Sequence, residues 1–483
     1  MHKGKVILIP GLPGWGLTNG YWESALDTSI CPGNLSILTA NPSPVASHHD
    51  RACEVFAQLT GTVVDYGQEH SKSFKHSRWG NDYSGRSALF PEWGSSSPVH
   101  FICHSGAVNT VRVLQKLLEI DFWNRRTSAE WILSVTSING ALNESALSEV
   151  INREVIHLVS RNFLCEQCKN QGCSFCLGIR VQKAAKILCR SVIWAATSKL
   201  KLDFQQIRLA LNWPTDHWIH DDSDNKESLS TEEVVDRLKS SLKCGMFSSG
   251  DNIIYDQTLE GINKLEEFFG SSSKVGHPLE HSPKFVHDKT FYLCLFSSAT
   301  TSSTLCIPPE MSPILWPFSA ILLDKNRSDR LEESTKIVIH KIHSISNSVD
   351  PIRDNDGMVT VINQCVPRGA ESLVEVFPEK AGWMSKNANL RPGVWYIDIV
   401  NKWIDEIDEV ACRSEAGSES IGAHIVSGDQ KRKILWDHFD ACWSRTLLKP
   451  THDQVPLDFQ RSLYRNLFLY ISSVQMLFES SLK

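Results

Sequence analysis

Pro98-Val99-His100-Phe101-Ile102-Cys103-His104-Ser105-Gly106-Ala107-Val108-Asn109-Thr110-Val111-Arg112-Val113-Leu114 is the stretch that decides the fold. An apolar run ends at a histidine, a serine follows, and a helical pattern begins at once. This layout is typical of a nucleophile elbow, a strained strand-to-helix turn that exposes a serine at the carboxyl edge of a parallel sheet. The usual glycines on either side are replaced by Cys103 and Ala107. An ordinary strand, loop and helix with Ser105 as N-cap stays the alternative.

Strand and helix patterns alternate along much of the chain. Apolar runs predict strands over 5–9, 35–39, 62–66, 99–103, 131–138, 291–296, 359–362 and 394–400. Helices are predicted over 50–59, 107–120, 431–448 and 457–477, and a polar loop region over 67–98. This alternation favours an α/β fold, with a mostly parallel central sheet and helices on both of its faces.

The composition is that of a globular protein. The chain has 483 residues, 41% of them hydrophobic, and a formal net charge of -6. This length suits one large α/β domain with insertions, or two domains, and we predict a single domain over 1–483. The charge gives no basic surface of the kind that binds nucleic acid, so nucleic acid is not an expected partner.

The sequence carries no strong targeting signal. The first apolar run, residues 6–9, is too short for the core of a signal peptide. The longest later one, Met311 to Leu323, is interrupted by Pro313 and Pro317 and falls short of a membrane span. We expect a cytoplasmic protein. Peripheral membrane or lipid-droplet association, and a leader missing from the sequence, stay open.

Two segments depart from the alternating pattern. Residues 145–250 carry amphipathic stretches and an acidic loop, and we interpret them as an insertion. Residues 401–421 are acidic and serine-rich, and they are predicted to be a loop insertion. The first insertion also holds Cys165, Cys168, Cys173 and Cys176 in a CxxC–x4–CxxC pattern. Paired CxxC motifs bind zinc, but usually across a longer spacer, so free thiols on a loop stay the alternative.

Several stretches together resemble the zinc-containing lipases of the α/β-hydrolase fold, the group of thermoalkalophilic and staphylococcal bacterial lipases and their plant triacylglycerol-lipase-like relatives. The strongest runs from Asp50-Arg51-Ala52-Cys53-Glu54-Val55-Phe56-Ala57-Gln58-Leu59 through His70-Ser71-Lys72 to His76. Further matches are Gly14-Trp15-Gly16, residues 99–105 and 132–137, Asn355-Asp356-Gly357 and Pro392-Gly393-Val394-Trp395-Tyr396. The resemblance implies an α/β-hydrolase fold, with residues 145–250 as a helical lid and zinc insertion.

The resemblance also implies a catalytic triad. A serine hydroxyl needs a neighbouring base, and the base needs an orienting carboxylate. In this fold the order along the chain is serine, acid, histidine. Ser105 is the implied nucleophile and Asp356 the implied acid, although Asp-Gly is by itself a common turn. His424, on a predicted loop after the last strand, is our preferred base. His438, inside a helical pattern, stays the alternative because residues 401–421 displace His424 from the family's position.

The remaining candidate residues form an oxyanion hole and a metal site. The backbone N–H of Gly106 is the expected first oxyanion donor, and by resemblance that of Leu12 is the second. The metal set implied by the resemblance is Asp50, His70, His76 and Asp203. Two imidazoles and two carboxylates suit zinc, and four protein ligands leave no open position, so the metal would be structural. The spacing of the two histidines predicts a loop. Taken alone, Asp50 is equally suited to cap a helix.

These residues favour a carboxylic ester hydrolase, and the resemblance implies a lipase that cleaves acylglycerols. The expected partner is a lipid or another ester, and action at a lipid–water interface stays open. The alternative is a non-catalytic relative that uses the zinc-braced fold for binding or as a scaffold. Cys103, Ala107 and the displaced histidine favour that alternative, and labelling of the serine by a fluorophosphonate probe separates the two.

Overall fold

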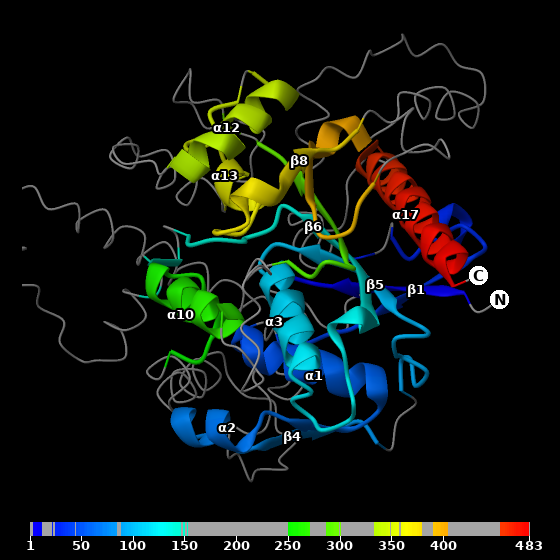
Figure 1. The fold of residues 1–483 in the computed structure, drawn as a ribbon, viewed down its shortest axis with the longest axis vertical. Coiled ribbons are helices and arrows are strands. Elements are labelled where there is room, and N and C mark those ends of the chain that lie inside the picture. Colours follow the sequence, from blue (N-terminus) through cyan, green and yellow to red (C-terminus); the bar gives the residue numbers. More distant parts are fainter. Residues whose placement is uncertain are drawn as a thin grey trace, which may run out of the picture.

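Figure 1 shows the fold of the 483-residue chain, taken from a computed structural model. The structure describes residues 3–11, 22, 25–43, 45–84, 88–145, 148–149, 152, 250–270, 286–298, 300, 333–347, 349–356, 359–378, 390–403 and 455–482.

The described residues form a seven-stranded sheet with the order β2-β1-β5-β6-β7-β9-β8. Every neighbouring pair of strands is parallel. The strands are β1 (Gly4–Ile9), β2 (Leu35–Thr39), β5 (Val99–His104), β6 (Ile132–Ile138), β7 (Phe291–Phe296), β8 (Val374–Val376) and β9 (Trp395–Ile399). Because all strands point the same way, the loops at their carboxyl ends meet at one edge of the sheet, where ligands bind in open α/β sheets.

The strands divide their side chains between two cores. Ile7 and Ile9 of β1 face one core, and Val6 and Leu8 face the other. Every residue of β5, β6 and β7 is buried. A parallel sheet that is covered on both faces requires such near-continuous apolar strands, which is why the sequence pattern identified most of them.

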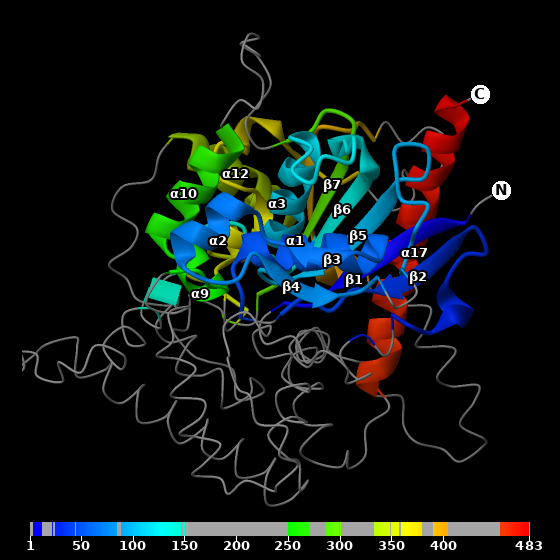
Figure 2. The same ribbon diagram turned by 90° about the horizontal axis from the view of Figure 1, so that it is seen from below.

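Helices cover both faces of the sheet. Helices α1 (His48–Thr60), α3 (Ala107–Glu119), α10 (Leu259–Gly270) and α12 (Glu333–Ile345) contribute to the first core, and α17 (Val455–Ser481) packs in the second. Figure 2 shows α17 apart from the other four helices, and α10 and α12 lie on the same side as α1 and α3. The shorter helices are α2 (Gln68–Phe74), α9 (Ile253–Asp256) and α13 (Val361–Cys365), with 3-10 helices at Thr28–Ile30, Ala129–Trp131, Glu371–Leu373 and Val400–Trp403.

Helix α1 has well-defined ends. The hydroxyl of Ser47 accepts a hydrogen bond from the N–H of Asp50, and the helix ends at Gly61, whose φ of 66° is left-handed. Both are common helix-boundary signals. Ser47 is therefore the N-cap, and Asp50 lies inside the first turn with its carboxylate available for another partner. A separate two-stranded antiparallel sheet follows, formed by β3 (Val63–Asp65) and β4 (Trp79–Asp82), with residues 66–78 between the strands.

The structure confirms most of the predicted strands and helices that lie among the described residues, whereas the predicted helix over 431–448 lies outside them. It also differs from the sequence analysis in several places, and helices α10 and α12 were not predicted. Residues 67–98, predicted as loop, contain α2 and β4. Residues 359–362, predicted as a strand, lead into helix α13, whose N-cap is Thr360. A four-residue apolar run does not distinguish a strand from a buried helix, and Val361 is fully buried. Strand β8 was missed because it has only three residues. Among the described helices, none combines the length and the apolar character that a membrane span requires.

Candidate active site and metal centre

Ser105 lies in a strained turn between β5 and α3. Its φ is 54°, in the left-handed region that non-glycine residues rarely adopt. This conformation costs roughly 1–2 kcal/mol and persists only where the surroundings enforce it. The N–H of Ser105 donates to the carbonyl of Ile138, and its carbonyl accepts from the N–H of Ala141, at 3.1 and 3.2 Å. The predicted strand–serine–helix turn is therefore present. The alternative, in which Ser105 is an ordinary N-cap with extended backbone, is wrong, because the N-cap of α3 is Gly106.

The two non-glycine neighbours fit the turn. Cys103, two residues before the serine, is fully buried in the core on the α3 side of the sheet. Ala107, two residues after it, is the first residue of α3 and is also fully buried in that core. Both side chains are small enough to pack where glycine is usual, so their presence does not prevent the elbow from forming.

The loop after β1 approaches the serine closely. A Cβ atom added to Gly11 would lie 2.7 Å from both the Ser105 Cβ and the His104 carbonyl oxygen. Only glycine allows this approach of one backbone to the other. The next residue, Leu12, lies outside the described residues, so its role as second oxyanion donor stays a prediction. Gly106, the other predicted donor, immediately precedes α3, where backbone N–H groups have no intrahelical acceptor.

Asp356 lies on a loop that is tied to the end of β7. The N–H of Asn355 donates to the hydroxyl of Thr300 at 2.9 Å, a few residues after that strand. The Asp356 carboxylate accepts from the N–H of Val359 at 2.8 Å. The elbow is joined to the same region, because the N–H of Leu142, next to the partner of Ser105, donates to the carbonyl of Asn363. The acid candidate and the serine thus lie on loops at the same edge of the sheet.

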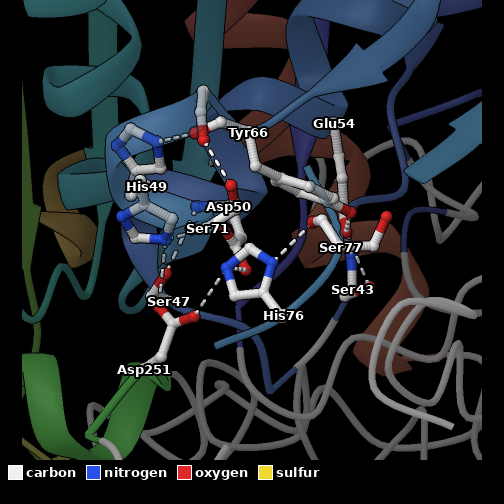
Figure 3. A network of polar contacts seen from close by, with 12 residues as sticks. Ser43, Ser47, His49, Asp50, Glu54, Tyr66, Ser71, His76, Ser77 and Asp251 are labelled. Carbon is white, nitrogen blue, oxygen red and sulfur yellow. Dashed lines mark hydrogen bonds and ion pairs between the residues drawn. The ribbon is translucent and has the colours of Figure 1, made fainter. Parts of the chain in front are cut away.

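Asp50, His70, His76 and Asp251 form a compact cluster whose potential ligand atoms all lie within 4.8 Å of one another. The His70 Nε2 atom lies 3.0 Å from Asp50 and 3.4 Å from Asp251. The His76 Nε2 atom lies 4.0 and 3.3 Å from the same two carboxylates. Figure 3 shows His76 directed toward Asp50 and Asp251. Two buried carboxylates and two imidazoles facing one another form a group that can hold a metal ion.

Four segments supply this cluster. Asp50 comes from the first turn of α1 and His70 from α2. His76 follows Lys75, the C-cap of α2, which has a left-handed φ of 63°. Asp251 precedes α9, whose N-cap is Asn252. The prediction that both histidines lie on a loop is wrong for His70, because residues 68–74 form a helix despite their polar composition.

Neighbouring groups orient the imidazoles. The Nδ1 atom of His76 lies 2.7 Å from the carbonyl of Ser77. A carbonyl only accepts, so Nδ1 carries a proton, and Nε2 is the ring nitrogen that faces the carboxylates and that a metal ion between them would bind. The ring of His49 stacks on that of His70 at 3.9 Å between centroids. Burial lowers the pKa of His49 to about 4, which leaves its ring neutral, and its Nε2–H donates to the carbonyl of Tyr66.

The two buried carboxylates of the cluster need a positive charge between them. Burial lowers the pKa of His70, but the carboxylates of Asp50 and Asp251 outweigh it and raise this pKa to about 10. His70 therefore holds a proton between two buried carboxylates. A divalent cation would replace that proton and neutralise both acids at once.

Sequence comparisons match the segment that contains most of these residues. A family model described as "Lipase-like, C-terminal domain" matches residues 33–126, which include Asp50, His70, His76 and Ser105. Over 104 residues the chain is 42% identical to a lipase of Staphylococcus hyicus. The resemblance to staphylococcal-type lipases is confirmed. The matched segment covers 22% of this chain and 15% of that lipase.

Solved structures support the α/β fold. EstA from Clostridium botulinum superposes with a TM-score of 0.53 at 22% identity, and the match covers 91% of this chain and 87% of EstA. The Staphylococcus hyicus lipase superposes with a TM-score of 0.51 at 20% identity, over 92% of this chain and 96% of the lipase. The predicted fold class is therefore correct.

The cluster contains one residue that the sequence analysis did not predict as a ligand. Asp203, predicted as the fourth ligand by resemblance, lies outside the described residues, and in the structure Asp251 completes the cluster. The sequence signal for Asp251 is weak, since Gly250-Asp251-Asn252 is also an ordinary turn before a helix. The base candidates His424 and His438 lie outside the described residues. So do the four clustered cysteines and most of the two predicted insertions.

Proposed function

We propose that the protein is a carboxylic ester hydrolase, and more narrowly a lipase that cleaves acylglycerols. The observation that carries the proposal is the elbow: Ser105 holds a left-handed φ of 54° between β5 and α3, with Gly11 packed against it. Backbone strain of this kind gathers at functional sites. The similarity to staphylococcal-type lipases indicates the substrate class.

In the proposed reaction the Ser105 hydroxyl attacks the ester carbonyl, and a histidine accepts its proton. We assign that base to His424. The same histidine then donates the proton to the leaving alcohol, and water repeats the sequence on the acyl-enzyme. Asp356 would hold the imidazole in the tautomer that faces Ser105.

We also propose that residues 145–250 form a lid. This role rests on the family resemblance and on the closeness of α9, which follows the insertion, to the elbow, since Ile253 would lie 3.2 Å from a Cβ at Gly106.

The oxyanion that forms during the attack needs N–H donors that are already in place. Gly106 precedes α3, whose positive dipole end also favours negative charge there. We propose Leu12 as the second donor. The tight packing of Gly11 on Ser105 supports this assignment, because it brings the loop that begins at Pro10 to the serine.

We propose that the cluster of Asp50, His70, His76 and Asp251 holds a structural zinc ion. Zinc bound by nitrogen and oxygen at about 2.0–2.2 Å in a tetrahedron requires ligand atoms roughly 3.3 Å apart. The four separations between imidazole Nε2 atoms and carboxylate oxygens are 3.0, 3.3, 3.4 and 4.0 Å, and one ligand atom from each residue lies within 4.8 Å of the others. Four protein ligands leave no position for substrate, so the ion would brace α1, α2 and the segment before α9 against one another without taking part in hydrolysis.

Turnover of esters of graded acyl length tests the proposed function. We expect the wild-type protein to hydrolyse p-nitrophenyl esters and to react covalently with a fluorophosphonate. A preference for long acyl chains and emulsified triacylglycerol would support the lipase assignment, and a preference for short soluble esters would narrow it to an esterase. A folded protein with neither turnover nor labelling would instead indicate a non-catalytic relative.

Replacing the proposed base is expected to have a large effect. His424→Ala should lower ester turnover by about 10³-fold or more, as loss of a triad base does, while His438→Ala should change it little. Both variants are measured at equal protein concentration, with circular dichroism to check that each is folded. If His438→Ala proves inactive and His424→Ala active, the base is His438.

Gly11→Ala is expected to impair turnover through the oxyanion loop. The added methyl would meet the His104 carbonyl and the Ser105 side chain at 2.7 Å, so the loop must move away. We expect kcat to fall by about 10²-fold, comparable with the loss of one oxyanion donor. Overpacking should also cost about 1–3 kcal/mol of stability. Gly33→Ala is the matched control, because a Cβ there has no neighbour within 4 Å. Unchanged kcat in Gly11→Ala would mean that this loop does not take part in catalysis.

A further inference from the structure

Arg51 is a fully buried cation that binds three backbone or hydroxyl oxygens beside the elbow. It follows Asp50 in α1 and has no solvent-exposed surface. Its Nε atom donates to the Thr110 hydroxyl at 3.1 Å, Nη1 to the Ser43 carbonyl at 2.5 Å, and Nη2 to the Pro10 carbonyl at 2.7 Å. All three acceptors are uncharged. Burial of a guanidinium is costly, so a site that keeps one and offers acceptors to its N–H groups in this way needs its geometry or its charge.

The three acceptors belong to three different segments that meet near Ser105. Pro10 ends β1 and precedes Gly11, the residue packed against the serine. Thr110 lies in the first turn of α3, which starts two residues after the serine. Ser43 lies between β2 and α1. The planar fork of one guanidinium joins these segments in a fixed arrangement, which the single ammonium of a lysine would not reproduce.

The bond to Pro10 fixes the direction of a peptide group. In a planar trans peptide, the carbonyl and the next N–H point in opposite directions. When Arg51 holds the Pro10 carbonyl, the plane that joins Pro10 to Gly11 is set, and with it the backbone of the glycine that packs against Ser105. Without this donor, the carbonyl of the buried Pro10 would lose a partner, and rotating the loop would be the simplest way to regain one.

We propose that Arg51 is a positioning residue that holds the loop after β1 in register with Ser105 and so preorganises the oxyanion hole. This inference rests on the proposed ester hydrolysis. Arg51 acts through the Pro10 carbonyl and through Thr110, and it does not touch the substrate.

The positive charge of Arg51 also acts electrostatically on residues beside Ser105. Burial raises the pKa of the Cys103 thiol, two residues before the nucleophile, and Arg51 opposes that rise. A fixed positive charge behind the elbow also favours the negative charge that develops on the substrate oxygen, in an environment that screens charge poorly.

The test compares Arg51→Met and Arg51→Lys with a matched buried arginine. Arg112, on α3, is also buried, donates to the side-chain oxygen of Asn109, and lies over the ring of Phe269, on elements other than β1. Turnover of a p-nitrophenyl ester gives kcat and KM, thermal unfolding gives stability, and the zinc content shows whether α1 keeps its metal ligands.

We expect Arg51→Met to lower kcat by about 10²-fold, near the loss of one oxyanion donor, with KM changed less than about threefold. The loss of kcat in Arg51→Lys should be intermediate between those of the wild-type protein and Arg51→Met, at about tenfold. Arg112→Met should lose stability to a similar degree but keep kcat within about threefold. A folded Arg51→Met protein with kcat near the wild-type value, or a fall in kcat that Arg112→Met matches, would overturn the proposal.

If Arg51→Met does not fold or loses its metal, variants of Thr110 test the proposal instead. Thr110→Val removes the acceptor of Nε and should lower kcat by about tenfold, and Thr110→Ser, which restores the hydroxyl, should recover most of that loss. Equal kcat values for Val and Ser at this position would overturn the proposal. A wild-type protein that neither turns over esters nor reacts with a fluorophosphonate would refute the proposed function itself, and the role of Arg51 with it. An active wild type beside an equally active Arg51→Met refutes only the role of Arg51.

Discussion

Ser105→Ala is expected to abolish ester turnover and fluorophosphonate labelling while leaving the protein folded. Removing the nucleophile of a triad lowers kcat by several orders of magnitude, to a remainder supplied by the oxyanion hole and by substrate binding. The hydroxyl is not needed for the turn, because the bonds that hold it are those of the backbone, to Ile138 and Ala141. The change in the free energy of unfolding should therefore stay within about 1 kcal/mol.

Ser105→Gly gives an internal control for the strained backbone. Glycine adopts a φ of 54° without the cost that serine bears there. The variant should be as inactive as Ser105→Ala and more stable than the wild-type protein by up to about 1 kcal/mol. Chemical denaturation of the three proteins measures this difference. Retained turnover in either variant would show that another residue is the nucleophile.

The elbow could be predicted because its signals are local. The apolar run of β5, the serine and the amphipathic pattern of α3 lie within one continuous stretch, and each element forms as its own sequence indicates. The φ of Ser105 could not be predicted in this way. It is imposed by the β6 loop through Ile138 and Ala141, and by the close approach of Gly11, all of which the fold brings together from separate segments.

The metal cluster could be predicted only in part, for the same reason. Asp50, His70 and His76 lie within one short block whose order matches the lipase family. Asp251 comes from beyond the long insertion, and only the packing of α9 near α1 brings it to the other three, with His48 N–H donating to the Asp256 carboxylate. Helix α2 was missed because only Ser71 of its seven residues is buried, which leaves no amphipathic pattern to detect.

The 359–362 segment shows how tertiary contacts override local preference. Its β-branched residues favour a strand. In the fold, the N–H of Val361 donates to the carbonyl of Asp354, and that of Ile362 to the carbonyl of Pro351. These bonds close the loop that carries Asp356 and begin α13 in place of a strand. The candidate acid is thus held by contacts that no local pattern contains.

Removing the two histidines of the metal cluster is expected to release the metal and destabilise the protein. We expect about one zinc per chain in wild-type protein purified without chelators, and none in the His70→Ala, His76→Ala double variant, by elemental analysis. A metal that binds only the folded state, present at about a thousandfold above its dissociation constant, adds about 4 kcal/mol to folding. The double variant should lose at least this amount, because Asp50 and Asp251 then face each other, both buried and without a cation between them.

The matched control for that variant is His340→Ala, His343→Ala on α12, where both side chains are exposed and lie outside the cluster. It should keep its zinc and its stability. A chelator should lower the unfolding temperature of the wild-type protein and of this control, and leave the double variant of the cluster unchanged. Because α1 also carries Arg51, loss of the metal should slow ester turnover as well, by loosening the helix that holds the loop after β1. Wild-type protein that contains no metal, or that unfolds at the same temperature with and without chelator, would contradict the assignment of Asp50, His70, His76 and Asp251 as ligands.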